Sequence, residues 1–173
     1  MIYFNFFLFV IIYKMPFEFN KKLWDLGRQI EDDTLPKINK YFECNFKRND
    51  NDIYDILDFK DDEAKKIVEI KGRRIASTKF EDTIITASKV NEGLCRIDDG
   101  FRVFFVFVFT DKIYEMELKE DQEFKVRFTG TNCIQHYMIP VKDLKEIKEP
   151  IEEESGGANF EYTSDEEESE KIN

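Results

Sequence analysis

The sequence predicts one domain of the α/β (α+β) class, in which helices flank a central β-sheet. Three patterns support this class. An amphipathic helical pattern begins at Asn20, and two apolar stretches joined by a polar turn follow at residues 53–59 and 66–71. Residues 101–110 are so apolar that both faces of that strand must be buried. With 173 residues, the chain is long enough for one domain with a real core.

The N-terminal end differs in composition from the domain, which we expect at residues 15–148. Residues 1–14 form an apolar extension whose run of about 13 residues is too short for a transmembrane helix, which needs roughly 20. The extension lacks the basic start and the small-residue cleavage site of a signal peptide. We therefore expect translation to start at Met15 and no stable membrane association, with a membrane anchor as the alternative.

Residues 149–173 are expected to form a disordered acidic tail. They hold ten acidic residues and one lysine, a balance of −9 out of the net charge of −11. So few apolar side chains cannot offset the entropy of ordering the chain. Such a tail keeps a protein soluble or binds a basic partner. Residues 15–148 carry only −3, so binding of nucleic acid requires local basic patches and metal ions.

The first element is predicted to be a helix that is interrupted at Pro36. Its apolar residues recur at helical spacing, at Leu23, Trp24, Leu26 and Ile30. Thr34 is expected to cap a following turn, after which the apolar stripe continues to Phe46.

The strand at residues 66–71 alternates its side chains between two faces. Glu69 and Lys71 point one way, and their apolar neighbours point the other way. The strand at residues 53–59 brings Asp55 and Asp58 beside them. If opposed residue numbers sum to an even number, Asp55 shares the face of Glu69. If they sum to an odd number, Asp58 does, because a slip of one residue switches the face.

Paired carboxylates on such a face favour a divalent cation. Two close carboxylates repel each other, and burial raises the free-energy cost of ionising both. Hard oxygen ligands suit Mg²⁺ or Mn²⁺, and a neighbouring lysine can then position or activate a water for attack on phosphorus. The alternative is a cross-strand ion pair on a solvated hairpin face.

An aspartate followed on the next strand by Glu69, Ile70 and Lys71 resembles the signature of the PD-(D/E)xK, or restriction-endonuclease-like, nucleases. The order of elements from about residue 26 to residue 147 also resembles that superfamily, including its viral and phage members. The resemblance implies a restriction-endonuclease-like core with a central mixed β-sheet flanked by helices. It also implies that Glu69 is a metal ligand, that Lys71 is the catalytic lysine, and that the Ile70 backbone carbonyl binds the metal.

The second acidic position of this signature is Asp55 or Asp58. Asp55 is preferred, because it resembles the family aspartate that lies just after an aromatic residue at the start of the strand. Asp58 is the alternative metal ligand. The sequence here departs from the nominal Pro-Asp of the family motif.

Two further residues match catalytic positions of the same superfamily. Glu31 lies in a stretch that resembles the first helix of many of these nucleases, where a glutamate faces the metal site. Lys89 matches a lysine at the start of a later helix, which points to the active site. The alternatives are an ordinary surface acid and a surface lysine.

A basic loop at residues 73–83 is expected at the mouth of the site. Arg73, Arg74 and Lys79 are its natural nucleic-acid contacts, because guanidinium and ammonium groups bind phosphate oxygens. The alternative is plain solvation. After this loop we expect a strand end running into a helix at residues 84–97, strands at 112–119, 123–129 and 135–139, and a short helix at 141–147.

The cysteine and histidine residues indicate the cellular compartment and limit the kinds of metal or catalytic site that the chain can form. Cys44, Cys95 and Cys133 fit no metal-ligand spacing, and their odd number argues against a disulfide framework, which indicates an intracellular protein of the cytoplasm or nucleus. His136 is the only histidine, so a histidine-based zinc site or triad is hard to build. Richness in Phe, Ile, Asn, Lys and Asp, with the viral resemblance, hints at a virus-encoded protein from an AT-rich genome.

These features together predict a small metal-dependent nuclease that hydrolyses phosphodiester bonds in DNA, with Mg²⁺ or Mn²⁺ as cofactor. One alternative is a catalytically inactive module on the same fold that binds nucleic acid or protein. Another is an unrelated α+β interaction domain in which the Glu-x-Lys pair is accidental. The sequence leaves the oligomeric state open, and a homodimer is allowed.

Overall fold

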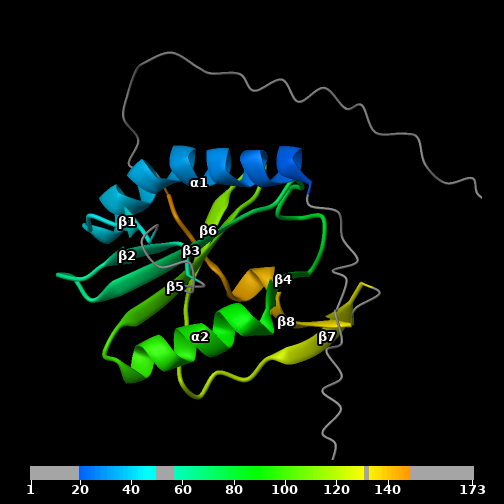
Figure 1. Cartoon of the computed structure of the whole chain (residues 1–173). Coiled ribbons are helices and arrows are strands. Elements are labelled where there is room, and N and C mark those ends of the chain that lie inside the picture. Colours follow the sequence, from blue (N-terminus) through cyan, green and yellow to red (C-terminus); the bar gives the residue numbers. More distant parts are fainter. Residues whose placement is uncertain (1–19, 50–56, 131–132, 149–173) are drawn as a thin grey trace, which may run out of the picture.

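The computed structural model describes residues 20–49, 57–130 and 133–148, which form two sheets and two α-helices (Figure 1). The larger sheet has six strands in the order β1-β2-β3-β5-β6-β9. Strands β3 and β5 are parallel and the other neighbours are antiparallel, so this sheet is mixed. Its strands are β1 (Lys47–Arg48), β2 (Phe59–Asp61), β3 (Lys66–Gly72), β5 (Arg102–Val108), β6 (Ile113–Glu117) and β9 (Lys145–Glu146). The predicted α+β class with a mixed sheet is confirmed.

The two helices cover opposite faces of the larger sheet (Figure 1). On one face, Ile38 of α1 (Lys21–Phe42) packs with Val68 and Val106 of the central strands. On the other face, Val90 of α2 (Ala87–Asp98) packs with Phe105. Strand β5 therefore lies between two apolar layers, which confirms that a strand so rich in Val and Phe is buried on both faces.

A second, three-stranded antiparallel sheet lies beside the first and was not anticipated. Its order is β4-β8-β7, built from β4 (Asp82–Thr86), β8 (Ile134–Pro140) and β7 (Lys125–Thr129). The sequence analysis expected each of these strands from its own residue pattern. It predicted a single central sheet, however, and not a second one. Strand β7 pairs with the next strand, β8, but the pairing of β4 with β8 joins segments far apart in the chain, which local periodicity does not report.

Helix α1 runs without a break through Pro36, so the predicted interruption is wrong. The Asn20 side chain accepts a hydrogen bond from the Leu23 N–H at the start of the helix. At the far end, Glu43 adopts a left-handed conformation, and its N–H bonds to the carbonyls of the last turn. Pro36 lies on the exposed side, while neighbouring Ile38 is fully buried against the sheet. Packing of that face keeps the helix continuous despite the lost hydrogen bond.

Two other expected elements also differ from the prediction. The strand expected at residues 53–59 pairs only from Phe59 onward, as β2, while residues 57–58 form a bend and residues 50–56 lie outside the described ranges. The helix expected at 141–147 is a single 3₁₀ turn, Val141–Asp143, followed by β9. There the Ile147 N–H bonds to the Ile113 carbonyl, so the sheet edge captures this segment. Within the described ranges, no helix is long and apolar enough to cross a membrane.

Candidate active site

The strand register brings Asp58 and Glu69 together. In the β2–β3 ladder Phe59 lies opposite Val68 and Asp61 lies opposite Lys66, so opposed numbers sum to an odd value. Asp58 therefore follows on the same face as Glu69, and the Asp58 N–H donates to Glu69 Oε2 at 3.2 Å. An odd sum is the register for which the sequence analysis places Asp58, and not Asp55, on the face of Glu69. Asp55, the preferred alternative, lies outside the described residues.

The site forms where the β2–β3 ladder stops. Val68 is the last residue of β3 that pairs with β2, although β3 continues to Gly72 in its pairing with β5. The Lys65 carbonyl and the Arg73 N–H both bond to β5. Along a parallel strand, the backbone hydrogen-bonding groups of successive residues point alternately to the strand on one side and the strand on the other. Because Lys65 and Arg73 point to β5, the backbone groups of the even-numbered Ile70 point to the side of β2. The Ile70 carbonyl, which the resemblance implies as a ligand, thus faces the edge where Asp58 lies.

Two lysines from different elements converge on Glu69. Lys71 Nζ lies 2.6 Å from Glu69 Oε1, as the alternation along β3 predicts. Lys89 Nζ lies 2.9 Å from Glu69 Oε2 and 3.6 Å from Asp58 Oδ1. Lys89 belongs to the first turn of α2, which directly follows β4, and this turn aims its side chain at β3. The structure thus brings Lys89 beside Glu69 and Asp58, and its catalytic role stays a prediction.

Glu69 is fully buried, and its environment perturbs its ionisation. Burial raises the pKa of Glu69 to about 7; Lys71 and Lys89 act in the opposite direction, and Asp58 adds to the rise. Burial by itself would lower the pKa of Lys71, but Glu69 and Asp58 outweigh it, and the pKa of Lys71 is raised. Lys71 therefore stays protonated at neutral pH, whereas Glu69 is partly protonated there in the absence of a metal.

The residues fit a hard divalent cation, although the protein groups alone do not complete its coordination. In the described part of the chain, Asp58 Oδ2 is a buried oxygen without a hydrogen bond, and the buried Glu69 Oε1 lies 2.6 Å from Lys71 Nζ. Such oxygens are suitable ligands, and Mg²⁺ commonly keeps several waters. Among these described residues, no group of three His, Cys, Asp or Glu side chains is placed to hold a metal.

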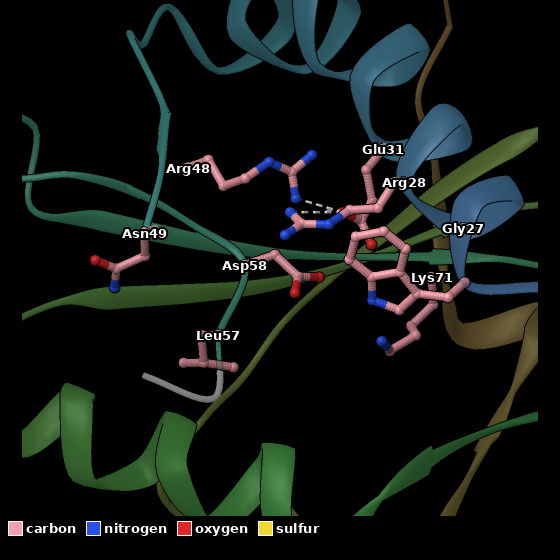
Figure 2. A pocket seen from close by; sticks show the side chains of 9 residues that line it. Gly27, Arg28, Glu31, Arg48, Asn49, Leu57, Asp58 and Lys71 are labelled. Atoms are coloured by element: carbon pink, nitrogen blue, oxygen red, sulfur yellow. Dashed lines mark hydrogen bonds and ion pairs between the residues drawn. The ribbon is translucent and has the colours of Figure 1, made fainter. Parts of the chain in front are cut away.

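An open cavity of about 360 Å³ lies beside this cluster (Figure 2). Asp58 and Lys71 line it from the sheet, and Glu31 lines it from α1. Glu31 Oε2 lies 2.6 Å from Arg48 Nη1 and 4.0 Å from Arg28 Nη1. Glu31 thus shares a cavity with Asp58 and Lys71, with no direct contact to Glu69 among the described interactions, and its role at a metal site stays a prediction.

The sequence prediction missed several residues of this cavity. They are Trp24, Gly27, Arg28, Arg48, Asn49 and Leu57. Arg48 is bound by Glu31 and by Asp32, each at 2.6 Å, and its guanidinium lies 4.5 Å from the centroid of the Phe59 ring. The only available signal was the first-helix resemblance around Glu31, which gave no reason to look at residues 47–49.

The three basic residues of the loop divide into two groups. Arg73 is half-buried: Nε donates to Thr83 Oγ1 at 2.9 Å, and Nη2 donates to the Ile84 carbonyl. Its hydrogen bonds thus serve the fold, which disfavours the expected phosphate contact. Arg74 and Lys79 are exposed, and Arg74 lines a separate cavity of about 580 Å³ beside α1. Both remain candidates for phosphate binding.

Comparisons with known proteins returned no match to a family model, to a curated protein or to a solved structure.

Proposed function

We propose that the chain is a metal-dependent nuclease that hydrolyses phosphodiester bonds in DNA. The observation that carries this proposal is the convergence of two acids, the fully buried Glu69 and Asp58, whose Oδ2 is buried without a hydrogen bond, beside two lysine ammonium groups. Burying carboxylates costs free energy unless a partner compensates it. A site of this kind at the mouth of a cavity is typical of function.

Each residue has a distinct role in the proposed reaction. Asp58 and Glu69, with the Ile70 carbonyl, would hold Mg²⁺ or Mn²⁺. When bound, the ion supplies positive charge at the phosphate and favours ionisation of a water. Protonated Lys71 donates a hydrogen bond that orients the attacking water, and Lys89 contacts the scissile phosphate. A water oxygen forms the new bond to phosphorus, and the ester oxygen leaves with the electron pair and takes up a proton.

The proposal is tested by incubating the full chain with plasmid, linear and single-stranded DNA, with and without Mn²⁺ or Mg²⁺. We expect metal-dependent cleavage that falls by at least about a hundredfold in Asp58→Ala, Glu69→Ala and Lys71→Ala, as for loss of one preorganised electrostatic group. The matched control is Asp62→Ala, an exposed carboxylate paired with Lys60 in the β2–β3 turn, which should cleave normally.

Asp55→Ala, assayed beside Asp58→Ala, decides between the two aspartates. Loss of cleavage in Asp58→Ala alone supports the register described above. Full activity in Asp58→Ala and Glu69→Ala would contradict the proposed site, whatever Asp55→Ala does.

The second candidate is a non-catalytic module that binds nucleic acid or protein. The observation in its favour is that both oxygens of Glu69 lie within 3 Å of an ammonium group, at 2.6 and 2.9 Å, so Glu69 has cationic partners without a metal. Binding of DNA without cleavage in the same assay would select this candidate. Neither binding nor cleavage would leave an α+β interaction domain of another kind.

A further inference from the structure

Trp24 occupies a place in the fold that core packing does not explain. The sequence pattern counts it with the apolar stripe of α1, yet the side chain is 49% exposed. It lines the same cavity as Asp58 and Lys71. A large aromatic side chain that remains half-exposed in a cavity beside catalytic candidates suggests contact with a ligand.

The charges around Trp24 suit a ligand that is both aromatic and anionic. The Arg28 guanidinium lies 5.0 Å from the centroid of the indole ring, a cation–π contact that helps to hold the ring in place. Among the residues that line the cavity, the cations Arg28, Arg48 and Lys71 outnumber the carboxylates Glu31 and Asp58. Arg28 is also more exposed than Arg48, with 37% against 16% of its side chain accessible.

We propose that Trp24 stacks on the base of an unpaired nucleotide, with Arg28 beside that nucleotide's phosphate and the next phosphate directed toward Lys71. The inference rests on the proposed function for the reaction at that phosphate, but the stack itself needs no cleavage. In a duplex both faces of each base are covered by its neighbours, so only an unpaired base offers a face to the indole. The substrate class is single-stranded DNA, or a duplex with a single-stranded end or flap.

The size of the cavity agrees with this occupant. About 360 Å³ lies at the lower end of the range for small-molecule pockets, roughly 300–1,000 Å³. It suits one nucleotide rather than a duplex. Base–aromatic stacking tolerates any base, so we expect little dependence on sequence.

The test uses the fact that Trp24 is the only tryptophan of the chain, so its fluorescence reports on this position alone. The full-length protein in EDTA is titrated with a single-stranded DNA oligonucleotide, with a blunt duplex of the same sequence, and with the RNA strand. We expect saturable quenching by the single strand and much weaker quenching by the duplex. Equal quenching by duplex and single strand overturns the proposal, and stronger quenching by RNA overturns the assignment to DNA.

Variants give a second readout through the anisotropy of a labelled strand. Trp24→Ala is expected to weaken single-strand binding by about 5- to 150-fold, the range for one base–aromatic stack. Trp24→Phe should retain part of the affinity. The matched control is Leu23→Ala, which removes a neighbour that is 47% exposed and lines the other cavity, and it should bind normally. Unchanged binding by Trp24→Ala, with a native circular dichroism spectrum, overturns the proposal.

The stack and the nuclease activity fail in distinguishable ways. In EDTA, Glu69→Ala should still show quenching, because it leaves Trp24, Arg28 and Lys71 in place. Quenching by the wild-type protein without metal-dependent cleavage supports the stack and removes the nuclease. Cleavage without quenching removes the stack and leaves the nuclease.

Discussion

The carboxyl group of Glu69 is subject to the strongest opposing electrostatic effects described at the site. It lies on the central strand with no exposed surface, between Lys71 of its own strand and Lys89 of α2. Burial disfavours its charged form, and the two ammonium groups favour it. The balance places its ionisation near neutral pH, where a small change in the surroundings changes its charge.

The pH dependence of stability should reveal this balance in metal-free protein. In the unfolded chain Glu69 ionises near its ordinary pKa of 4.5, but in the folded protein its pKa is about 7. The folded state thus holds a proton that the unfolded state has lost. The stabilisation is fully present below pH 4.5 and is lost as the pH rises through about 7, a total of about 3 kcal/mol.

Urea unfolding in EDTA across this pH range measures the effect. Glu69→Gln cannot titrate at this position, so its free energy of unfolding should fall less steeply between pH 5 and pH 8. The difference between the two proteins isolates Glu69 from the other titrating groups. Parallel pH profiles would show that burial does not raise the pKa of Glu69.

At the scale of the element, two helical glycines have opposite surroundings. A Cβ at Gly93 of α2 would lie 2.8 Å from Leu118 Cδ2 and 3.2 Å from Val103 Cγ1, both of them buried residues. A Cβ at Gly27 of α1 would meet no atom within 4 Å. Gly93 thus allows α2 to approach the sheet closely, whereas Gly27 lies next to open space.

Alanine at the two glycines should therefore change stability in opposite directions. Gly93→Ala gains up to about 1 kcal/mol of helix propensity but overpacks the core by about 1–3 kcal/mol, so we expect a net loss. Gly27→Ala gains the propensity term alone and should be stabilising by up to about 1 kcal/mol. Thermal or urea unfolding at fixed pH measures both. A shift of the same sign in both variants would contradict the close approach of α2.

At the scale of the whole molecule, Arg73 forms hydrogen bonds that connect the two sheets. It follows β3 of the larger sheet, and its guanidinium bonds to Thr83 and Ile84 of β4 in the smaller sheet. The ring of Phe107 lies 5.5 Å from the guanidinium carbon. The adjacent Arg74 is exposed instead. Two neighbouring arginines in one basic loop thus have different surroundings.

Substitution of each arginine should separate these roles. Arg73→Met leaves buried acceptors unpaired and should lower the free energy of unfolding by about 2–4 kcal/mol. Arg74→Met should change it by no more than about 0.5 kcal/mol, but should weaken DNA binding and reduce the salt slope by about 1. Urea unfolding and DNA titrations at several salt concentrations measure the two effects. Weaker DNA binding by folded Arg73→Met than by Arg74→Met would restore Arg73 as a phosphate contact.

Much of the fold followed from local patterns. Alternation along β3 placed Glu69 and Lys71 on one face, and the apolar run of β5 required burial on both faces. Continuity of α1 through Pro36 did not follow, because packing of Ile38 outweighs the local cost of the proline. The second sheet did not follow either, since β4 joins the β7–β8 hairpin across a long separation along the chain.

Some features of the candidate site also followed from local sequence patterns, and others did not. The sequence by itself determined the chemistry that each strand carries, because the two-residue repeat of a strand assigns side chains to faces without reference to any other segment. Only the tertiary structure decided that Asp58 opposes Glu69, that Arg73 turns inward, and that Trp24 shares a cavity with Lys71. These outcomes depend on where β2 stops pairing and on how α1 crosses the sheet, and both are set by packing between segments far apart in the chain.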